Sequence, residues 1–230
     1  MLYKLHSLLY RKDALTASGL FDELNYFINM LPEWEEKKEC WMIAHPTQKM
    51  IAINNSRATD DVLNYIDSLI SKNKNISIVL ADESEDDSII TIWYKNTPTV
   101  SANRYTLSIT MKSLIGYNDL DTFLNVFNQL IKYNGLIFKY ILLDTEQYRF
   151  NQKTVFDDRL PVGWMLYLPI KIGYEDVPSA YKLYYPDHEL GTIVISNRVF
   201  NGSDSKDILR ANDIEIELAV NGLLPLIAEL

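Results

Sequence analysis

Apolar and polar residues alternate over residues 104–111, and this pattern predicts a strand with one buried face. The apolar set is Tyr105, Leu107, Ile109 and Met111, and the residues between them are Thr106, Ser108 and Thr110. A period of two is typical of an antiparallel sheet with one face on the core and the other in water. Further strands are expected at 2–10, 40–44, 49–53, 76–80, 89–95, 138–143, 163–168, 181–185 and 192–196.

Four other segments carry apolar residues at helical spacing, namely 18–31, 60–72, 119–133 and 204–220. The clearest is 119–133, where apolar side chains recur every three or four residues and Gly135 follows as a C-terminal stop. In 204–220 the apolar residues spread widely around the axis, so this helix is expected to be well buried.

The order of these elements predicts the fold class. Strands occur in runs with helices before and after them, and strands and helices do not alternate as βαβ units. We therefore expect an α+β fold, a mainly antiparallel sheet with about four helices packed against it. The chain is expected to form a single domain over 1–230, with two packed halves, 1–135 and 136–230, as the alternative.

Charge and composition narrow the range of possible functions. The 230 residues include 22 Lys and Arg against 31 Asp and Glu, which gives a formal net charge of −9. This acidity argues against nucleic-acid binding and suits a basic protein partner. The single cysteine, Cys40, excludes an intramolecular disulfide. The sequence shows no signal peptide and no apolar run long enough for a membrane helix, so a cytoplasmic protein without membrane contact is expected.

Enzyme signatures are missing from the sequence. It contains no GxGxxG, P-loop, GxSxG or HExxH motif, and we expect no cofactor, no metal and no catalytic residue. Three weaker candidates are Cys40 with a distant histidine, the pair Asp157 and Asp158, and His188 with its acidic neighbours. A small hydrolase that uses His188 with Asp157 or Asp158 is therefore one alternative. A buried cysteine, a solvated loop and a turn explain the same residues without catalysis.

Two segments are candidates for binding a partner. The first is an acidic run at an expected hairpin tip, with carboxylates at Asp82, Glu83, Glu85, Asp86 and Asp87. It would attract a basic partner, although a solvated loop is the simpler interpretation. The second mixes tyrosines with carboxylates, and its residues are Tyr181, Tyr184, Tyr185, Asp187 and Glu189. Tyrosine is common both at interfaces and in half-buried strands. This segment could therefore bind Arg or Lys side chains of a partner, form a homodimer interface, or simply be a half-buried strand.

A resemblance to a known family rests on the C-terminal third. Its string GWMLYLP at 163–169 is followed by GTIVIS at 191–196, and NGLLP at 221–225 closes the pattern. The predicted helix between GTIVIS and NGLLP contributes Ala211, Ile214, Glu215 and Leu218. The pattern resembles immunity protein 52, a family of bacterial polymorphic-toxin immunity proteins. In the string itself, Trp164, Leu166 and Leu168 are expected on one face of a strand and Met165 and Tyr167 on the other, as core residues.

The resemblance implies an α+β protein that binds and neutralises a cognate toxin. The toxin would carry a restriction-endonuclease-like nuclease domain, and neutralisation would come from covering its active site or holding it inactive. Because nuclease surfaces that grip phosphates tend to be basic, an acidic inhibitor fits this role. A regulatory binding module without a toxin is the remaining alternative.

Overall fold

The computed structural model describes most of the chain. The described residues are 1–32, 39–44, 49–72, 75–82, 90–96, 103–112, 119–151, 153–186 and 191–230. The strands are β1 (Leu2–Arg11), β2 (Cys40–Ala44), β3 (Lys49–Asn54), β4 (Arg57–Ala58), β5 (Ser77–Asp82), β6 (Ile90–Asn96), β7 (Arg104–Lys112), β8 (Leu136–Thr145), β9 (Met165–Leu168), β10 (Lys182–Tyr184) and β11 (Thr192–Ile195). The helices are α1 (Ala17–Met30), α2 (Asp60–Ser71), α3 (Leu120–Lys132), α4 (Ser205–Val220) and a 3-10 turn, η1 (Ile227–Glu229).

All eleven strands join in one sheet, in the order β10-β11-β9-β8-β1-β7-β6-β5-β2-β3-β4. Every neighbouring pair is antiparallel. The N-terminal strand β1 lies between β7 and β8, so both halves of the sequence hydrogen-bond to it. The fold class expected from the sequence, α+β with a mainly antiparallel sheet and four α-helices, is confirmed for the described residues.

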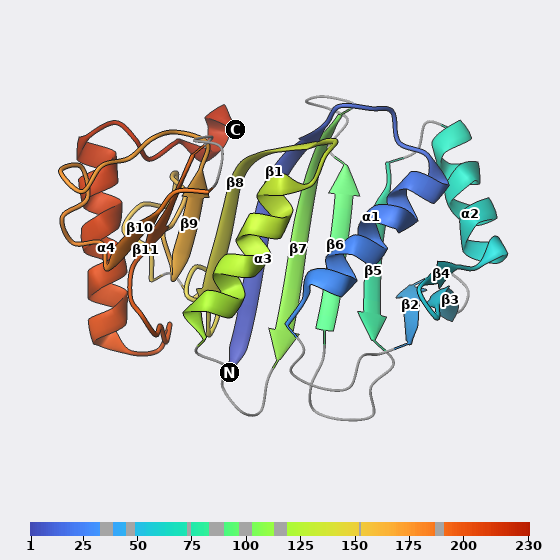
Figure 1. Cartoon of the computed structure of the whole chain (residues 1–230), viewed down its shortest axis with the longest axis horizontal. Helices are drawn as coiled ribbons and strands as arrows, with labels where there is room; N and C mark the ends of the chain where they lie inside the picture. Colours follow the sequence, from blue (N-terminus) through green and yellow to red (C-terminus); the bar gives the residue numbers. More distant parts are fainter. Residues whose placement is uncertain are drawn as a thin grey trace.

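Helices α1 and α3 lie on the same face of the central strands (Figure 1). The strands point alternate side chains toward these helices. On β7, for example, Tyr105, Leu107, Ile109 and Met111 are buried, and the residues between them are half-buried. The one-sided strand predicted from the 104–111 pattern is therefore confirmed. Helix α2 adds Val62 and Ile66 to the same core beside Ile53 of β3.

Helix α4 covers the other face of the sheet, over β9–β11. Ile214 and Leu218 pack in a second apolar cluster, which also contains Leu166 of β9 and Val194 of β11. Their strand neighbours Met165, Tyr167, Ile193 and Ile195 belong to the first core. Since successive strand residues point to opposite faces, these strands are covered on both sides. That is why β9 and β11 are buried along their full length.

The face of β5, β6 and β7 that points away from α1 is not covered by any helix of the described part of the chain (Figure 1). Trp93 of β6 is 46% exposed there, and its neighbour across the ladder, Val79 of β5, is 38% exposed. The Trp93 indole donates to the Ser77 hydroxyl at 3.0 Å, and the Lys95 ammonium lies 5.8 Å from the ring centroid.

The helix ends agree with the sequence patterns except in detail. Helix α1 begins at Ala17, one residue before the predicted start, and is capped by Thr16, whose hydroxyl accepts from the Gly19 amide at 3.1 Å. Asp119 and Asp204 cap α3 and α4. The expectation that the last helix is well buried is wrong, because Leu209, Ile216 and Val220 of α4 are 61%, 44% and 81% exposed. They lie along one face of the helix, which points away from the sheet.

Candidate functional site

The acidic segment predicted as a hairpin tip begins at the end of β5. Strands β5 and β6 pair as antiparallel neighbours, as expected. Asp82 ends β5, and its carboxylate accepts from the Ile90 amide at 3.0 Å, which joins the two ends of the segment. The other predicted carboxylates lie outside the described residues: Glu83, Glu85, Asp86 and Asp87.

The tyrosines of the second predicted segment lie at the sheet edge formed by β10. Tyr181 and Tyr185 are 41% and 44% exposed. Tyr184 is half-buried, and its hydroxyl accepts from the Asn128 amide group of α3 at 3.0 Å. Their acidic neighbours Asp187 and Glu189 lie outside the described residues. The described tyrosines thus present partly exposed rings at an edge strand.

Two of the tyrosine hydroxyls in this region bond to backbone groups. The Tyr174 hydroxyl accepts from the Leu183 amide of β10 at 3.1 Å, and the Tyr185 hydroxyl donates to the Ile172 carbonyl at 2.8 Å. An occupied edge amide opposes pairing with a strand of another chain. A partner at this edge would therefore contact side chains and not extend the sheet.

The two predicted segments do not come together. Seven strand-to-strand steps separate β10 from β5 in the sheet. At about 4.8 Å per step, Tyr184 and Asp82 are roughly 30 Å apart across the strands. They could serve one large partner, but they do not form a single site.

The residues that carry the family resemblance are core residues. Trp164 is fully buried, donates to the Asn197 carbonyl at 2.9 Å and meets Phe123 of α3 edge to face at 5.2 Å. The predicted strand alternation is wrong at this residue, because Trp164 belongs to the same core as Met165 and Tyr167. The reason is Gly163, whose φ of +56° turns the chain just before β9. A Cβ at Gly163 would lie 3.0 Å from the Leu143 carbonyl oxygen.

Glu215 of the same pattern is a buried carboxylate on α4, 1% exposed. It accepts from the Tyr148 hydroxyl at 3.0 Å and from the amides of Val155 and Val162 at 2.8 and 3.1 Å. Burial raises its pKa, and these hydrogen bonds oppose the rise. Glu215 thus fastens the segment after β8 to α4, which is a structural role.

A second buried carboxylate, Glu23 of α1, forms an ion pair with Arg11 at the end of β1. Arg11 is 9% exposed and Glu23 is 6% exposed. The Tyr94 hydroxyl donates to Glu23 at 3.2 Å, and the Arg11 guanidinium stands 5.7 Å from the centroid of the Tyr105 ring. This network joins β1, β6 and α1 inside the core.

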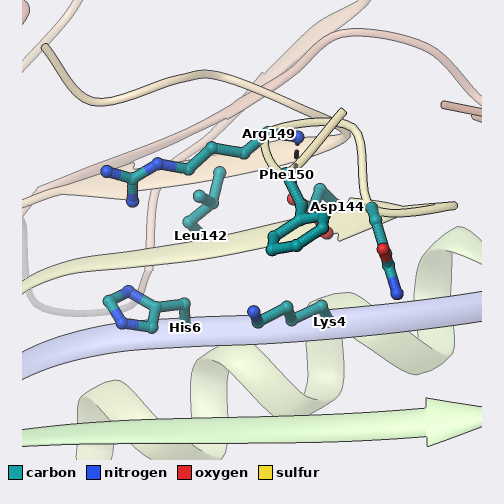
Figure 2. A pocket seen from close by; sticks show the side chains of 7 residues that line it. Lys4, His6, Leu142, Asp144, Arg149 and Phe150 are labelled. Atoms are coloured by element: carbon teal, nitrogen blue, oxygen red, sulfur yellow. Dashed lines mark hydrogen bonds between the residues drawn. The ribbon is translucent and has the colours of Figure 1, made fainter. Parts of the chain in front are cut away.

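A small pocket of about 270 Å³ opens beside β1 and β8. Its lining residues are Lys4, His6, Leu142, Asp144, Gln147, Arg149 and Phe150 (Figure 2). The strand register explains four of them, because Lys4 faces Asp144 and His6 faces Leu142 across the β1–β8 ladder. The turn after β8 supplies the others. Glu146 and Gln147 both have positive φ, 49° and 55°, and so return the chain over the sheet.

The pocket combines a buried acid with a neutral histidine. Burial raises the pKa of Asp144 to about 6, although the Arg149 amide and the charges of Lys4 and Arg149 oppose the rise. Burial lowers the pKa of His6 to about 4, and the positive charges of Arg149 and Lys4 act in the same direction. His6 Nδ1 is hydrogen-bonded to the Tyr140 hydroxyl at 2.8 Å. At neutral pH, Asp144 is therefore ionised and His6 is uncharged.

The residues considered for catalysis do not form a site in the described structure. Asp157 and Asp158 are both exposed, and His188 lies outside the described residues. Cys40 is half-buried on β2, where full burial was expected. The described residues contain no group of three or more His, Cys, Asp or Glu placed to hold a metal ion. Within the same residues, no helix has the length and apolar character needed to cross a membrane.

Comparison with known proteins identifies a similar fold. No protein-family model and no curated protein matches the chain. Among solved structures, one match covers 95% of this chain and 73% of the other, with a TM-score of 0.59 and 12% sequence identity. That structure is the Pseudomonas aeruginosa T6SS protein PA0821. The fold is similar to that of PA0821. At this identity the similarity concerns the fold alone.

The sequence patterns did not identify the pocket beside β1 and β8. One signal was present, since Asp144 directly follows the apolar run Ile141–Leu143 at the end of a predicted strand. Lys4 and His6 interrupt the apolar pattern of the first strand in the same way. Their convergence depends on the pairing of β1 with β8, across more than half of the chain, and sequence spacing cannot show that.

Proposed function

We propose that this protein is an immunity protein that binds and neutralises a cognate nuclease-type toxin of a type VI secretion system (T6SS). Neutralisation would come from covering the toxin's active site or from holding the toxin inactive. No step of this function requires a catalytic residue or a cofactor in this chain.

The observation that carries the proposal is the fold similarity to the T6SS protein PA0821 over 95% of the chain. The sequence resemblance to immunity protein 52 in residues 163–225 is a second support, and it rests on the sequence alone. Trp164 and Glu215 of that region are fully or almost fully buried, so the residues that carry the resemblance belong to the scaffold. Both observations are consistent with a protein associated with a toxin-secretion system, and the immunity role is the proposal that joins them.

The charge of −9 supports a basic partner such as a nuclease domain. The proposed contact residues are the acidic segment that begins at Asp82 and the tyrosine-rich edge at β10. Rings that are partly exposed, such as Tyr181 and Tyr185, offer large contact areas at little entropic cost. Since the two segments lie far apart across the sheet, the toxin would contact one of them or span the distance between them.

Co-expression tests the proposal. The probe is the product of the neighbouring reading frame, which the proposal expects to end in a nuclease domain, expressed with and without this protein in the same cells. We expect the nuclease to arrest growth, this protein to relieve the arrest, and the purified pair to form a complex without nuclease activity. Growth arrest that persists despite well-expressed protein would contradict the proposal.

A variant with a destabilised core provides a control for this experiment. Trp164→Ala removes a fully buried ring, which typically costs about 3–5 kcal/mol of stability. We expect this variant to give no protection, because protection by binding needs the folded surface. Equal protection by Trp164→Ala and the wild type would point to an effect of expression alone.

A further inference from the structure

The pocket beside β1 and β8 holds positive charges that no described carboxylate neutralises by direct contact. The side chains of Lys4 and Arg149 form no ion pair or side-chain hydrogen bond within the described residues. Figure 2 shows the Arg149 guanidinium and the His6 ring at one end of the pocket. Lys4, which faces Asp144 across the β1–β8 ladder, lies between His6 and Asp144. The Arg149 end is suited to an anionic group, and a guanidinium binds carboxylates in a planar, two-point geometry.

The other end of the pocket carries an acceptor without a partner. Asp144 is 4% exposed, and one carboxylate oxygen accepts from the Arg149 amide at 3.5 Å. The second oxygen, Oδ1, has no hydrogen-bond partner. A buried carboxylate oxygen left unpaired is costly, and such groups are usually satisfied by a protein donor, an ordered water or a ligand that brings its own donor. Asp144 lies beside Phe150 in this pocket (Figure 2).

We propose that this pocket binds the zwitterionic head of a free α-amino acid. The α-carboxylate would lie against Arg149 and Lys4, and the α-ammonium would donate to Asp144. Leu142 and Phe150 would contact an aliphatic side chain, since they are the apolar members of the lining. This inference does not depend on the immunity function.

The mixed charge of the pocket selects this ligand over simpler anions. Inorganic phosphate carries between one and two negative charges near neutral pH and would place them beside the ionised Asp144 carboxylate, where like-charge repulsion opposes binding. A carboxylate without an ammonium group would satisfy Arg149 and Lys4 but not Asp144. A volume of about 270 Å³ accommodates a small amino acid but not a nucleotide.

Three ligands that differ by one group provide the test. L-leucine carries both charges, 4-methylpentanoate lacks the ammonium, and 3-methylbutylamine lacks the carboxylate. Titration calorimetry on the full chain should show leucine binding at least about tenfold more tightly than either analogue, because each analogue leaves one end of the pocket unpaired. Equal binding of leucine and 4-methylpentanoate would overturn the role of Asp144. So would phosphate that binds as tightly as leucine.

Single substitutions test the Asp144 end and the Arg149 end of the pocket separately. Asp144→Asn should weaken leucine about tenfold and should not weaken 4-methylpentanoate, because the change removes a negative charge near its carboxylate, whereas Arg149→Gln should weaken both. Arg198→Gln is the matched control, because Arg198 is an exposed arginine outside the pocket. The proposal fails if no ligand binds the wild type up to about 10 mM, or if Arg198→Gln weakens leucine as much as Arg149→Gln does. The wild-type ligand series decides the matter even if a variant misfolds.

Discussion

At the scale of single residues, Asp144 and His6 show how one pocket can make two opposing contributions to stability. Burial disfavours the charged form of both groups, so it raises the pKa of the acid from 3.8 to about 6 and lowers that of the base from 6.5 to about 4. Between pH 4 and 6 the folded protein holds a proton on Asp144 that the unfolded chain has released. In the same range the unfolded chain holds a proton on His6 that the folded protein lacks.

The signs of the two effects are therefore opposite. As pH falls from 6 to 4, Asp144 increases stability and His6 decreases it, and the similar shifts nearly cancel. Asp144→Asn removes only the first effect. We expect it to be more stable than the wild type at pH 7, by up to about 3 kcal/mol, with the difference shrinking as the pH approaches 4.

Urea unfolding of wild type, Asp144→Asn and His6→Gln between pH 4 and 8 measures these contributions. The His6→Gln variant should lose less stability on acidification than the wild type, since its unfolded chain has no imidazole to protonate. A free-energy difference between wild type and Asp144→Asn that does not change with pH would contradict the expected shift of Asp144.

The buried pair of Arg11 and Glu23 gives a second prediction at this scale. Removing one partner leaves the other charge buried without compensation, so Arg11→Met should cost about 3–5 kcal/mol. The double variant Arg11→Met with Glu23→Gln should cost less than the sum of the single changes, because it leaves no unpaired charge. Chemical denaturation of all four proteins in a double-mutant cycle tests this, and additive costs would show that the pair is not coupled.

At the scale of elements, Glu215 links α4 to the segment that follows β8. Replacing Glu215 by Gln puts an NH2 group opposite backbone donors, so we expect a loss of about 1–3 kcal/mol. The amide protons of Val155 and Val162 should also exchange faster with solvent. The exposed Glu229→Gln is the control and should change neither property. Unchanged exchange at Val155 and Val162 would mean that other contacts hold this segment.

The elements themselves were largely predictable, and the exceptions have physical causes. Local period decides strand or helix, so segments such as β7 and α3 are recognisable from their own residues. The two-residue β4 is too short to show a period. Helix α4 has apolar residues around much of its axis, yet it packs only through one side. Burial depends on which neighbours cover a face, and a single helix does not encode that.

At the scale of the whole molecule, the order of strands could not be read from the sequence. The first strand becomes central because β7 and β8, more than 90 residues later, pair with its two edges. The pocket at Asp144 arises from that long-range register. Local pattern predicted the strands that adjoin the two proposed contact segments, β5, β6 and β10, but the separation of roughly 30 Å between Asp82 and Tyr184 follows only from the sheet order.

Charge reversal in the acidic segment tests whether its local charge or the net charge of the protein governs association with the toxin. Asp86→Lys with Asp87→Lys changes the net charge from −9 to −5, and we expect association with the toxin's nuclease domain to slow at least about tenfold at low salt. The control is Asp157→Lys with Asp158→Lys, which makes the same change on an exposed loop elsewhere. Stopped-flow association at several salt concentrations compares the two.

The control variant at residues 157–158 shows whether the acidic segment contributes beyond its share of the net charge, because both variants reduce the net charge equally and so weaken the long-range attraction to a basic toxin equally. Only a segment that faces the partner during encounter should lose additional rate, since screening leaves interactions beyond about 8–10 Å weak at physiological salt. If the variants at residues 86–87 and 157–158 slow association by the same factor, the net charge alone steers the toxin, and the contact surface must be sought at the tyrosine-rich edge of β10.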